Sequence, residues 1–312
     1  MVRQILRGLV TYIPGLNNLL VRKTGGTNSA RYCYSVWLRH LVMAHEKGLN
    51  INPKIVAEIG PGDSIGVGLA SLITGSEKYF ALDVIKHASV ELNLKIFDEL
   101  LELIERRSPI PDVEEFPRIK PYLQEYEFPH HILSKNRIDK ALNKKRIDAI
   151  RRSILINHTT ESYIQYKVPY DMPHIIKDRS VDMIFSQAVL EHVTNINQSY
   201  QSMYYWLNDD GYLSHQIDFK SHGTSDEWNG HWTYSDFLFK VIQGKRVHLI
   251  NREPLSIHLS TLKKIGFYPI CILKNITKSN IEKKALSSRF RNMEEDDLVT
   301  SGVFIQAVKK IK

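Results

Sequence analysis

The sequence predicts an α/β fold built on a mostly parallel sheet, and three observations support this prediction. A short apolar run at 55–59 shows no strict alternation, as expected of a strand buried on both faces. A glycine-rich turn at 60–66 follows it, and an apolar stretch of helix length comes next at 67–73. Residues 78–84 then form a second predicted strand, which completes a β-turn-α-β unit of about thirty residues.

The composition sets limits on the class of protein. The chain has 312 residues, which suffices for one large α/β domain with additions, and 43% hydrophobic residues exclude global disorder. Its two cysteines, Cys33 and Cys271, are far apart and have no partner at metal-ligand spacing, so neither a disulfide framework nor a zinc site is predicted. Without an apolar run of about 18 residues or a secretory signal, we expect a cytoplasmic protein that does not cross a membrane.

Residues 1–50 are interpreted as an N-terminal helical extension. The first predicted helix spans 1–13 and ends at Pro14-Gly15, and a second covers about 29–45. One face of the first helix is apolar and consists of Val2, Ile5, Leu6, Leu9, Val10 and Ile13. This face either packs against the domain or makes peripheral contact with an anionic membrane surface. Aromatic residues of the second helix, such as Tyr32, are candidates for a wall of the active site or for the core.

Residues 51–312 form the predicted main domain, with a helical insertion at about 86–160. Helical periodicity at 89–107 gives way to five prolines within 108–131 and resumes at 135–156. We expect this insertion to fold over one edge of the sheet.

Basic charge is concentrated in the insertion. Residues 135–152 contain eight basic and two acidic residues, a net charge of +6, within a chain whose formal charge is +8. Two interpretations stay open: a solvated helix face, or a surface that binds phosphate on the acceptor or on a membrane.

The rest of the domain resumes the alternation of strands and helices. Strands are predicted at 163–168, 181–186 and 212–219, helices at 197–206 and 255–265, and an antiparallel pair at 267–273 and 302–308. A turn is predicted at Asn208 to Gly211.

The glycine-rich turn carries the first chemical signal. Its spacing, Gly60-x-Gly62-x-x-x-Gly66, differs from that of a dinucleotide site and lacks the Gly-Lys-Ser/Thr of a nucleoside triphosphate loop. Asp83 ends the second predicted strand, where a carboxylate can accept hydrogen bonds from both ribose hydroxyls. The segment 182–193 supplies a third signal, because a strand there is followed by Glu191-His192 and a helix.

Together these motifs resemble those of class I S-adenosylmethionine-dependent methyltransferases, over about 51–86 and 163–308. The resemblance implies a Rossmann-like, seven-stranded, mostly parallel sheet with a reversed last strand, and S-adenosyl-L-methionine as the cofactor. The sequence resembles in particular methyltransferases of bacterial surface-polysaccharide biosynthesis.

The resemblance also implies roles for cofactor-binding residues. Gly60 and Gly62 would approach the methionine part, Asp83 would hold the ribose, and Glu58 would bind the amino end. Tyr170-Asp171 would contact the adenine, although this segment departs from the family's usual Gly-Asp-Ala form. Ser186 and Gln187 would face the sulfonium. The long insertion departs from the family's usual interval, so the acceptor side is not inherited.

Acceptor chemistry is inferred from the histidines at and beyond the strand at 212–219. A sugar hydroxyl needs a base, and His215 or His222 is the candidate, oriented by Asp218. A metal held by His215, Asp218 and His222 matches no firm ligand motif, so no metal is predicted. Glu191 and His192 either order the turn after their strand or act in catalysis.

The predicted function is therefore methyl transfer, by O-methylation, to a small-molecule, sugar or glycan acceptor that can carry phosphate. Two alternatives stay open: a noncatalytic module that binds a membrane or protein partner, and an RNA methyltransferase. Nucleic acid is the weaker candidate partner, because the chain has no Asn/Asp-Pro-Pro-Tyr motif and no recognisable RNA-binding appendage.

Overall fold

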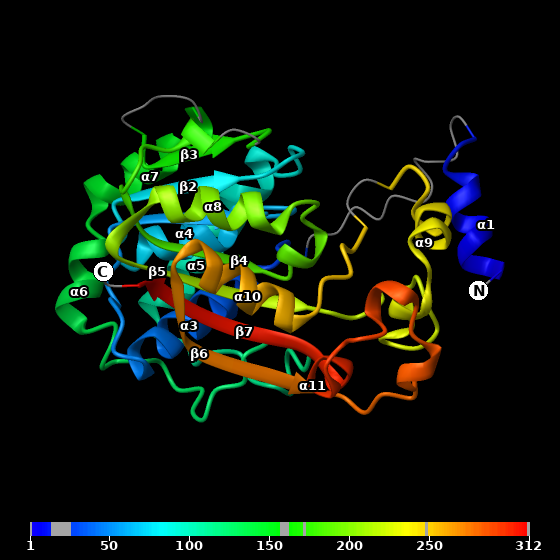
Figure 1. Cartoon of the computed structure of the whole chain (residues 1–312). Coiled ribbons are helices and arrows are strands. Elements are labelled where there is room, and N and C mark those ends of the chain that lie inside the picture. The colour runs from blue at the N-terminus through cyan, green and yellow to red at the C-terminus, as the bar shows by residue number, and fades with distance from the viewer. Residues whose placement is uncertain (1, 14–25, 157–161, 171–172, 247–248, 311–312) are drawn as a thin grey trace.

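The core of the structure, a computed structural model that describes residues 2–13, 26–156, 162–170, 173–246 and 249–310, is a seven-stranded sheet (Figure 1). The strands lie in the order β3-β2-β1-β4-β5-β7-β6. Their bounds are β1 Ile55–Ile59, β2 Lys78–Leu82, β3 Ile164–Lys167, β4 Val181–Gln187, β5 Leu207–Asp218, β6 Phe267–Ile276 and β7 Thr300–Lys309. β7 runs antiparallel to both of its neighbours, β5 and β6, and the other strand pairs of the described sheet are parallel. The predicted Rossmann-like fold with a reversed last strand is confirmed.

Helices cover both faces of the sheet because successive strand residues point to opposite sides. Val56 belongs to one hydrophobic core, with α3 (Ala30–Glu46), α4 (Gly66–Ile73) and α5 (Val90–Glu105). Ala57 belongs to the other core, with α8 (Ile196–Trp206) and α10 (Leu255–Ile265), which lie toward the viewer in Figure 1. Since α3 packs directly on the sheet, only part of the predicted extension at 1–50 lies outside the core.

Local sequence sets the ends of these helices. Ser29, Ser89 and Asn195 each cap a helix by accepting a hydrogen bond from a backbone N–H in its first turn. Gly266 ends α10 with φ +110°, in the left-handed region that favours glycine, and lets the chain turn into β6.

The insertion covers the helical layer and also, through α7 (Lys144–Ile156), the edge strand β3. After α5, the proline-rich segment runs across α3, where the buried Arg39 donates hydrogen bonds to the carbonyls of Pro111 and Pro121. The predicted helical stretch 135–156 is two helices, α6 (Lys135–Ala141) and α7 (Lys144–Ile156). They meet at Leu142 and Asn143, and the 3.6-residue pattern alone does not reveal this break.

Arginines of the basic segment support the opposite end of the sheet from the predicted site. Arg137 donates to the carbonyls of Ile51 and Thr74, and Arg146 donates to those of Leu72 and Ser76. These carbonyls precede β1 and β2, at the end of the sheet remote from the arrowheads of the parallel strands (Figure 1). The prediction that this segment binds acceptor phosphate is therefore wrong for these arginines, which satisfy loop carbonyls instead.

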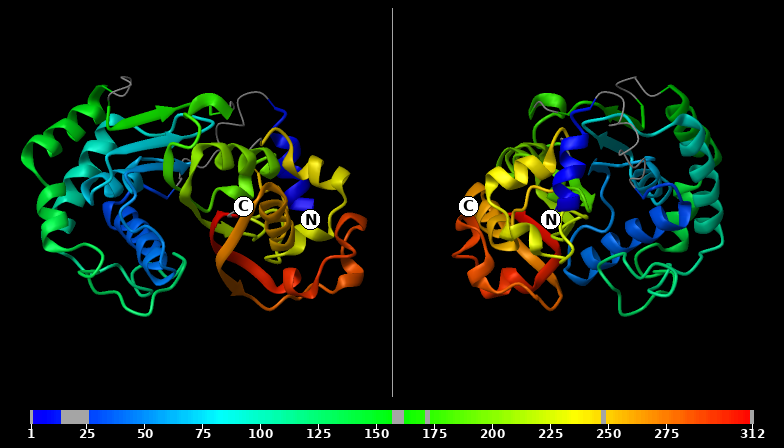
Figure 2. Two further views of the ribbon diagram at one scale, coloured as in Figure 1. Left: turned by 60° about the vertical axis from the view of Figure 1, so that its left-hand side comes forward. Right: turned by 90° about the vertical axis from the view of Figure 1, so that its right-hand side faces the viewer.

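Beyond the carboxyl ends of the parallel strands lies a small cap that pairs the N-terminal helix with a segment more than two hundred residues later in the sequence. In it α1 (Val2–Val10) packs against α9 (Asp236–Gln243), and both views in Figure 2 show them side by side. Ile5 of α1 joins a small core of Tyr234, Phe239, Ile242 and Ile250. The short helices η3 (Gly230–Thr233), η4 (Lys283–Ala285), η5 (Ser288–Phe290) and α11 (Glu295–Val299) complete this end of the molecule. Within the described residues, every helix is too short or too polar to span a bilayer.

Candidate cofactor and acceptor site

The predicted cofactor residues converge at the carboxyl edge of β2, β1 and β4. Gly60 and Gly62 follow β1, Asp83 follows β2, and Gln187 ends β4. Backbone hydrogen bonds tie the edge together, from Gly60 N–H to the Leu82 carbonyl (2.8 Å) and from Tyr170 N–H to the Asp83 carbonyl (3.1 Å). Ligands of open α/β sheets bind at this edge, because the crossovers leave a crevice there.

The turn after β1 needs glycine for its backbone. Gly60 and Gly62 have φ of +67° and +78°, in the region that an L side chain adopts only with strain. A Cβ on Gly60 would also lie 2.6 Å from a methyl carbon of Val189. The chain after β4 therefore packs directly on this turn at Gly60.

Asp83 is held beside the turn. Its Oδ1 accepts hydrogen bonds from the backbone N–H of Val84 (2.7 Å) and Ile85 (3.3 Å), and the side chain is buried. Burial raises the pKa of Asp83 above its ordinary value, while the N–H groups of Ile85, Val84 and Gly62 and the charge of His87 oppose that rise. The contribution of Gly62 places the backbone of the glycine turn close to the Asp83 carboxylate.

Tyr170 lies next to this carboxylate, after β3. Burial first, and then the charge of Asp83, raise the pKa of Tyr170 to about 12, so its phenol stays protonated at neutral pH. An aromatic side chain beside a ribose-binding acid can pack on a base. Asp171, predicted with it, lies outside the described residues.

Glu58 is a buried acid beneath the turn. It accepts a hydrogen bond from the hydroxyl of Tyr79, and burial raises the pKa of Glu58 to about 8. Tyr79 in turn packs against Gly68 of α4, where a Cβ would overlap the ring. The helix α4 therefore needs a glycine at position 68 to lie this close to β2.

Tyr32 of α3 is partly buried and packs against the core on the α3 face of the sheet. Its ring meets that of Phe116 edge to face, with the ring centroids 6.0 Å apart. Burial raises the pKa of Tyr32 above its ordinary range, and the charges of Cys33, Glu58 and Glu191 add to the effect. Of the two predicted roles, packing in the core is the one these contacts describe, and a wall of the site stays a prediction.

Ser186 and His215 do not face the site in the way the sequence suggested. They are paired across β4 and β5, both fully buried, with Ser186 Oγ 2.8 Å from His215 Nδ1. Burial lowers the pKa of His215 to about 3. His215 and Asp218 are three residues apart on a strand and so point to opposite faces. The prediction of His215 as the base is therefore wrong, as is that of Ser186 as a residue open to the sulfonium, because both side chains are buried against each other.

The structure instead brings Asp218 to His222. Asp218 ends β5, and its Oδ2 lies 3.8 Å from His222 Nε2 and 3.7 Å from Lys220 Nζ. Burial lowers the pKa of His222, Lys220 adds to this effect and Asp218 opposes it. Of the two candidate histidines, His222 is the one placed at the open carboxyl edge.

The turn after β4 contributes more to the site than the sequence indicated. Glu191 and His192 lie in η2 (Leu190–His192), close to His222, whose ring centroid is 5.0 Å from that of His192. Asn251 holds this turn, because its side-chain amide donates to the carbonyls of Leu190 and Val193. Asn251 is about sixty residues away along the chain, and no local sequence signal marks it for this role.

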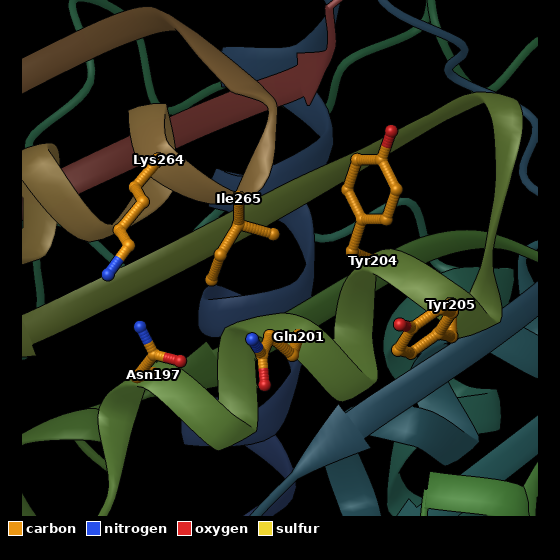
Figure 3. Close-up of a pocket in the computed structure, with 6 residues that line it drawn as sticks. All are labelled: Asn197, Gln201, Tyr204, Tyr205, Lys264 and Ile265. Carbon is orange, nitrogen blue, oxygen red and sulfur yellow. The ribbon is translucent and has the colours of Figure 1, made fainter.

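An open pocket lies elsewhere, on the outer surface between α8 and the end of α10 (Figure 3). It is lined by Asn197, Gln201, Tyr204, Tyr205, Lys264 and Ile265. None of these residues belongs to the carboxyl edge, so this pocket is separate from the candidate site.

No family model and no curated protein matches the chain. Solved structures similar to it include an S-adenosylmethionine-dependent methyltransferase from Mesorhizobium loti, with 11% identity, 83% of this chain and 91% of that chain covered, and a TM-score of 0.40. A putative sarcosine dimethylglycine methyltransferase from Galdieria sulphuraria has 11% identity, with 87% of this chain and 84% of that chain covered, and a TM-score of 0.45. The Haemonchus contortus phosphoethanolamine N-methyltransferase 2, in complex with S-adenosyl-L-methionine, has 12% identity, with 88% of this chain and 53% of that chain covered, and a TM-score of 0.43. These values are too low to carry an argument about acceptor or mechanism.

Proposed function

We propose that the chain is an S-adenosylmethionine-dependent methyltransferase that methylates an oxygen of a sugar, glycan or other small acceptor, as in surface-polysaccharide biosynthesis. The observation that carries this proposal is the meeting of Gly62 and Asp83 at the carboxyl edge of the sheet. A backbone free of side chain and a buried carboxylate together suit an adenosyl group, because the ribose hydroxyls can donate to the carboxylate.

The other residues of the edge have matching roles in the proposal. Tyr170 packs on the adenine, Gln187 faces the methionine part, and Glu58 supports the turn from below. Gln187 Nε2 donates to the Lys120 carbonyl (3.4 Å), and its side chain lies close to His40. Its Oε1 is buried without a hydrogen-bond partner of good geometry within the described part of the chain, and the proposal assigns a ligand's amino group to it.

Methyl transfer requires the protein to align the acceptor with the cofactor's methyl group, and it requires no covalent intermediate with the protein. The acceptor oxygen attacks the methyl carbon in line with the carbon–sulfur bond, which breaks and leaves its electron pair on sulfur. A hydroxyl must lose its proton in the process. Asp218 and His222 are the pair proposed to activate it, since they lie together at the end of β5.

Cofactor binding is the first test of this function. Calorimetry with S-adenosyl-L-methionine should show binding to the wild-type chain, and Asp83→Ala should weaken it by about tenfold or more, because two charge-assisted hydrogen bonds are lost. Asp178→Ala, an exposed acid before β4, is the matched control and should bind normally. If the wild-type chain does not bind the cofactor, the noncatalytic alternative replaces the enzyme.

Acceptor class is tested separately. Transfer of labelled methyl to nucleotide sugars, glycan lipids and RNA should occur with a sugar-bearing acceptor. Labelling of RNA alone would favour the RNA methyltransferase.

The surface of α1 supports a second proposal, peripheral contact with an anionic membrane. Val2, Leu6, Leu9, Tyr12 and Ile13 are exposed, whereas Gln4 and Gly8 face α9. The basic residues of this region, Arg3, Arg7 and Lys245, carry charge of the sign that anionic lipid attracts.

Vesicle sedimentation tests this contact. The whole chain should bind vesicles that contain anionic phosphatidylglycerol more strongly than neutral ones, and Leu6→Ser with Leu9→Ser should lower the bound fraction several-fold. Equal sedimentation of this double variant and the wild type would contradict the proposal.

A further inference from the structure

A cluster of ligand-type side chains stands next to the proposed acceptor position. Glu191 and His192 come from η2 after β4, and His222 comes from the loop after β5. One possible ligand atom from each residue lies within 4.8 Å of those of the other two. Segments thirty residues apart in sequence therefore present three ligand-type groups to one point.

Glu191 is the unusual member of this cluster. Its side chain is 2% exposed, and in the described part of the chain neither carboxylate oxygen has a hydrogen-bond partner of good geometry; the backbone N–H groups of Glu191 and Asp218 and the Lys220 ammonium act on it more weakly. Burying a carboxylate without a close partner is costly, so buried acids are normally paired with a cation or bound to a metal. His192 and His222 are the side chains beside this carboxylate, and neutral imidazole nitrogens are good metal ligands.

The charges around the cluster favour a cation. Asp218 adds a second carboxylate 3.8 Å from His222 Nε2, and Lys220 Nζ lies 3.7 Å from the same carboxylate oxygen. When Glu191 and Asp218 are both ionised, two carboxylates face one ammonium, and an ion of charge +2 would more than balance the difference.

We propose that Glu191, His192 and His222 coordinate one divalent transition-metal ion, with Asp218 beside it. Mixed imidazole and carboxylate ligands suit Mn²⁺, Fe²⁺ and Zn²⁺ better than Mg²⁺ or Ca²⁺, which prefer oxygen ligands alone. Bonds of about 2.1 Å put ligand atoms roughly 3–4 Å apart, so closing the cluster requires side-chain shifts of about 1 Å or less. Such shifts are open to His222, which lies on an exposed loop.

This site deepens the proposed function and rests on it for its chemical role. The ion would bind the acceptor hydroxyl and lower its pKa, and Asp218 would take the proton. The resulting alkoxide attacks the methyl carbon, the carbon–sulfur bond breaks, and S-adenosylhomocysteine and the methyl ether form. His222 then acts as a ligand, and no free imidazole base is needed.

Direct metal binding tests the site without the cofactor or any acceptor. Electron paramagnetic resonance of the whole chain titrated with Mn²⁺ should show one bound ion, and added Zn²⁺ should displace it. Glu191→Gln and His222→Ala should each weaken Mn²⁺ binding by about tenfold or more. His174→Ala, an exposed histidine of η1 (Pro173–Ile175), is the matched control and should bind as the wild type does.

Folding and function are kept apart in this test. Glu191→Gln preserves the volume of the buried side chain, and His222 is exposed, so thermal unfolding of the metal-free variants should match that of the wild type within a few degrees. If the wild type binds neither Mn²⁺ nor Zn²⁺, or if Glu191→Gln and His222→Ala bind as tightly as it does, the metal site is refuted. Because S-adenosyl-L-methionine binding is measured without metal, failure there would refute the proposed enzyme and leave the metal result unaffected.

Discussion

Single residues at the proposed cofactor edge of the sheet show how burial alters the chemistry of side chains that the sequence predicted there. Glu58, Asp83 and Gln187 occupy the strand ends that local sequence predicted for them. Their partners were not predictable, because the contacts of Glu58 with Tyr79 and of Gly62 with Asp83 each join residues about twenty positions apart. The same limitation explains His215, whose position on the strand was predicted but whose burial was not.

The buried acid Glu58 gives a prediction about stability and pH. The pKa of Glu58 is about 8 in the folded protein, above its ordinary value of 4.5, so the folded state binds more protons between these values than the unfolded state does. The stability that the neutral carboxyl contributes is complete below about pH 4.5 and is lost as pH rises through about 8. The Glu58→Gln side chain cannot ionise, so between pH 5.5 and 8.5 the free energy of unfolding of this variant should fall by about 1–3 kcal/mol less than that of the wild type. Urea unfolding without ligand measures both. Parallel pH profiles of the two proteins would contradict the assignment.

At the scale of secondary-structure elements, hydrophobic periodicity predicted every strand of the sheet but not every boundary. The turn predicted at Asn208 to Gly211 belongs to β5, which begins at Leu207, and a register shift between Val181 and Met183 accommodates it. Leu207 pairs with Val181 and Tyr212 with Met183, so residues 208–211 bulge out of the ladder between these two pairs, and the local turn preference persists as a bulge within β5. The helix α9 was not predicted; it is short and lies in the cap.

The basic helices α6 and α7 give a prediction at this scale. Arg137→Ala should lower the free energy of unfolding by about 2–4 kcal/mol, because the arginine side chain donates hydrogen bonds to the carbonyls of Ile51, Thr74 and Ile132. Lys140→Ala, an exposed change on the same helix, should stay within about 0.5 kcal/mol of the wild type. Chemical denaturation measures both. Equal stability of the two variants, with a loss of acceptor binding only in Arg137→Ala, would restore the phosphate-binding interpretation.

At the scale of the whole molecule, the cap joins the N-terminal helix to a segment more than two hundred residues away. The Gln4 amide donates to Asp226, and Lys245 N–H donates to the hydroxyl of Thr11. A Cβ on Gly8 would lie 2.0 Å from the Val241 carbonyl oxygen. Gln4, Gly8 and one apolar residue, Ile5, therefore make this contact, whereas most of the apolar side of α1 is left exposed, which is the reverse of the usual arrangement.

This contact predicts the effect of one methyl group. Gly8→Ala should force α1 away from α9 and raise amide hydrogen exchange in α1 by about tenfold, while exchange in the sheet stays unchanged. Leu9→Ala, an exposed neighbour, is the control and should leave exchange as it is. Unchanged protection of α1 in Gly8→Ala would mean that the contact contributes little to holding the cap.

The amino-acid sequence by itself determined the α/β class, the order of the elements and the edge of the sheet where a cofactor would bind, because periodicity and turn chemistry are properties of short contiguous segments. Only the tertiary structure decided that Asp218 meets His222 instead of His215, that basic arginines support loops at the far edge, and that α1 exposes its apolar side. Those outcomes depend on which distant segments pack together and on which side chains that packing removes from water, and neither is encoded in the local pattern of any one segment.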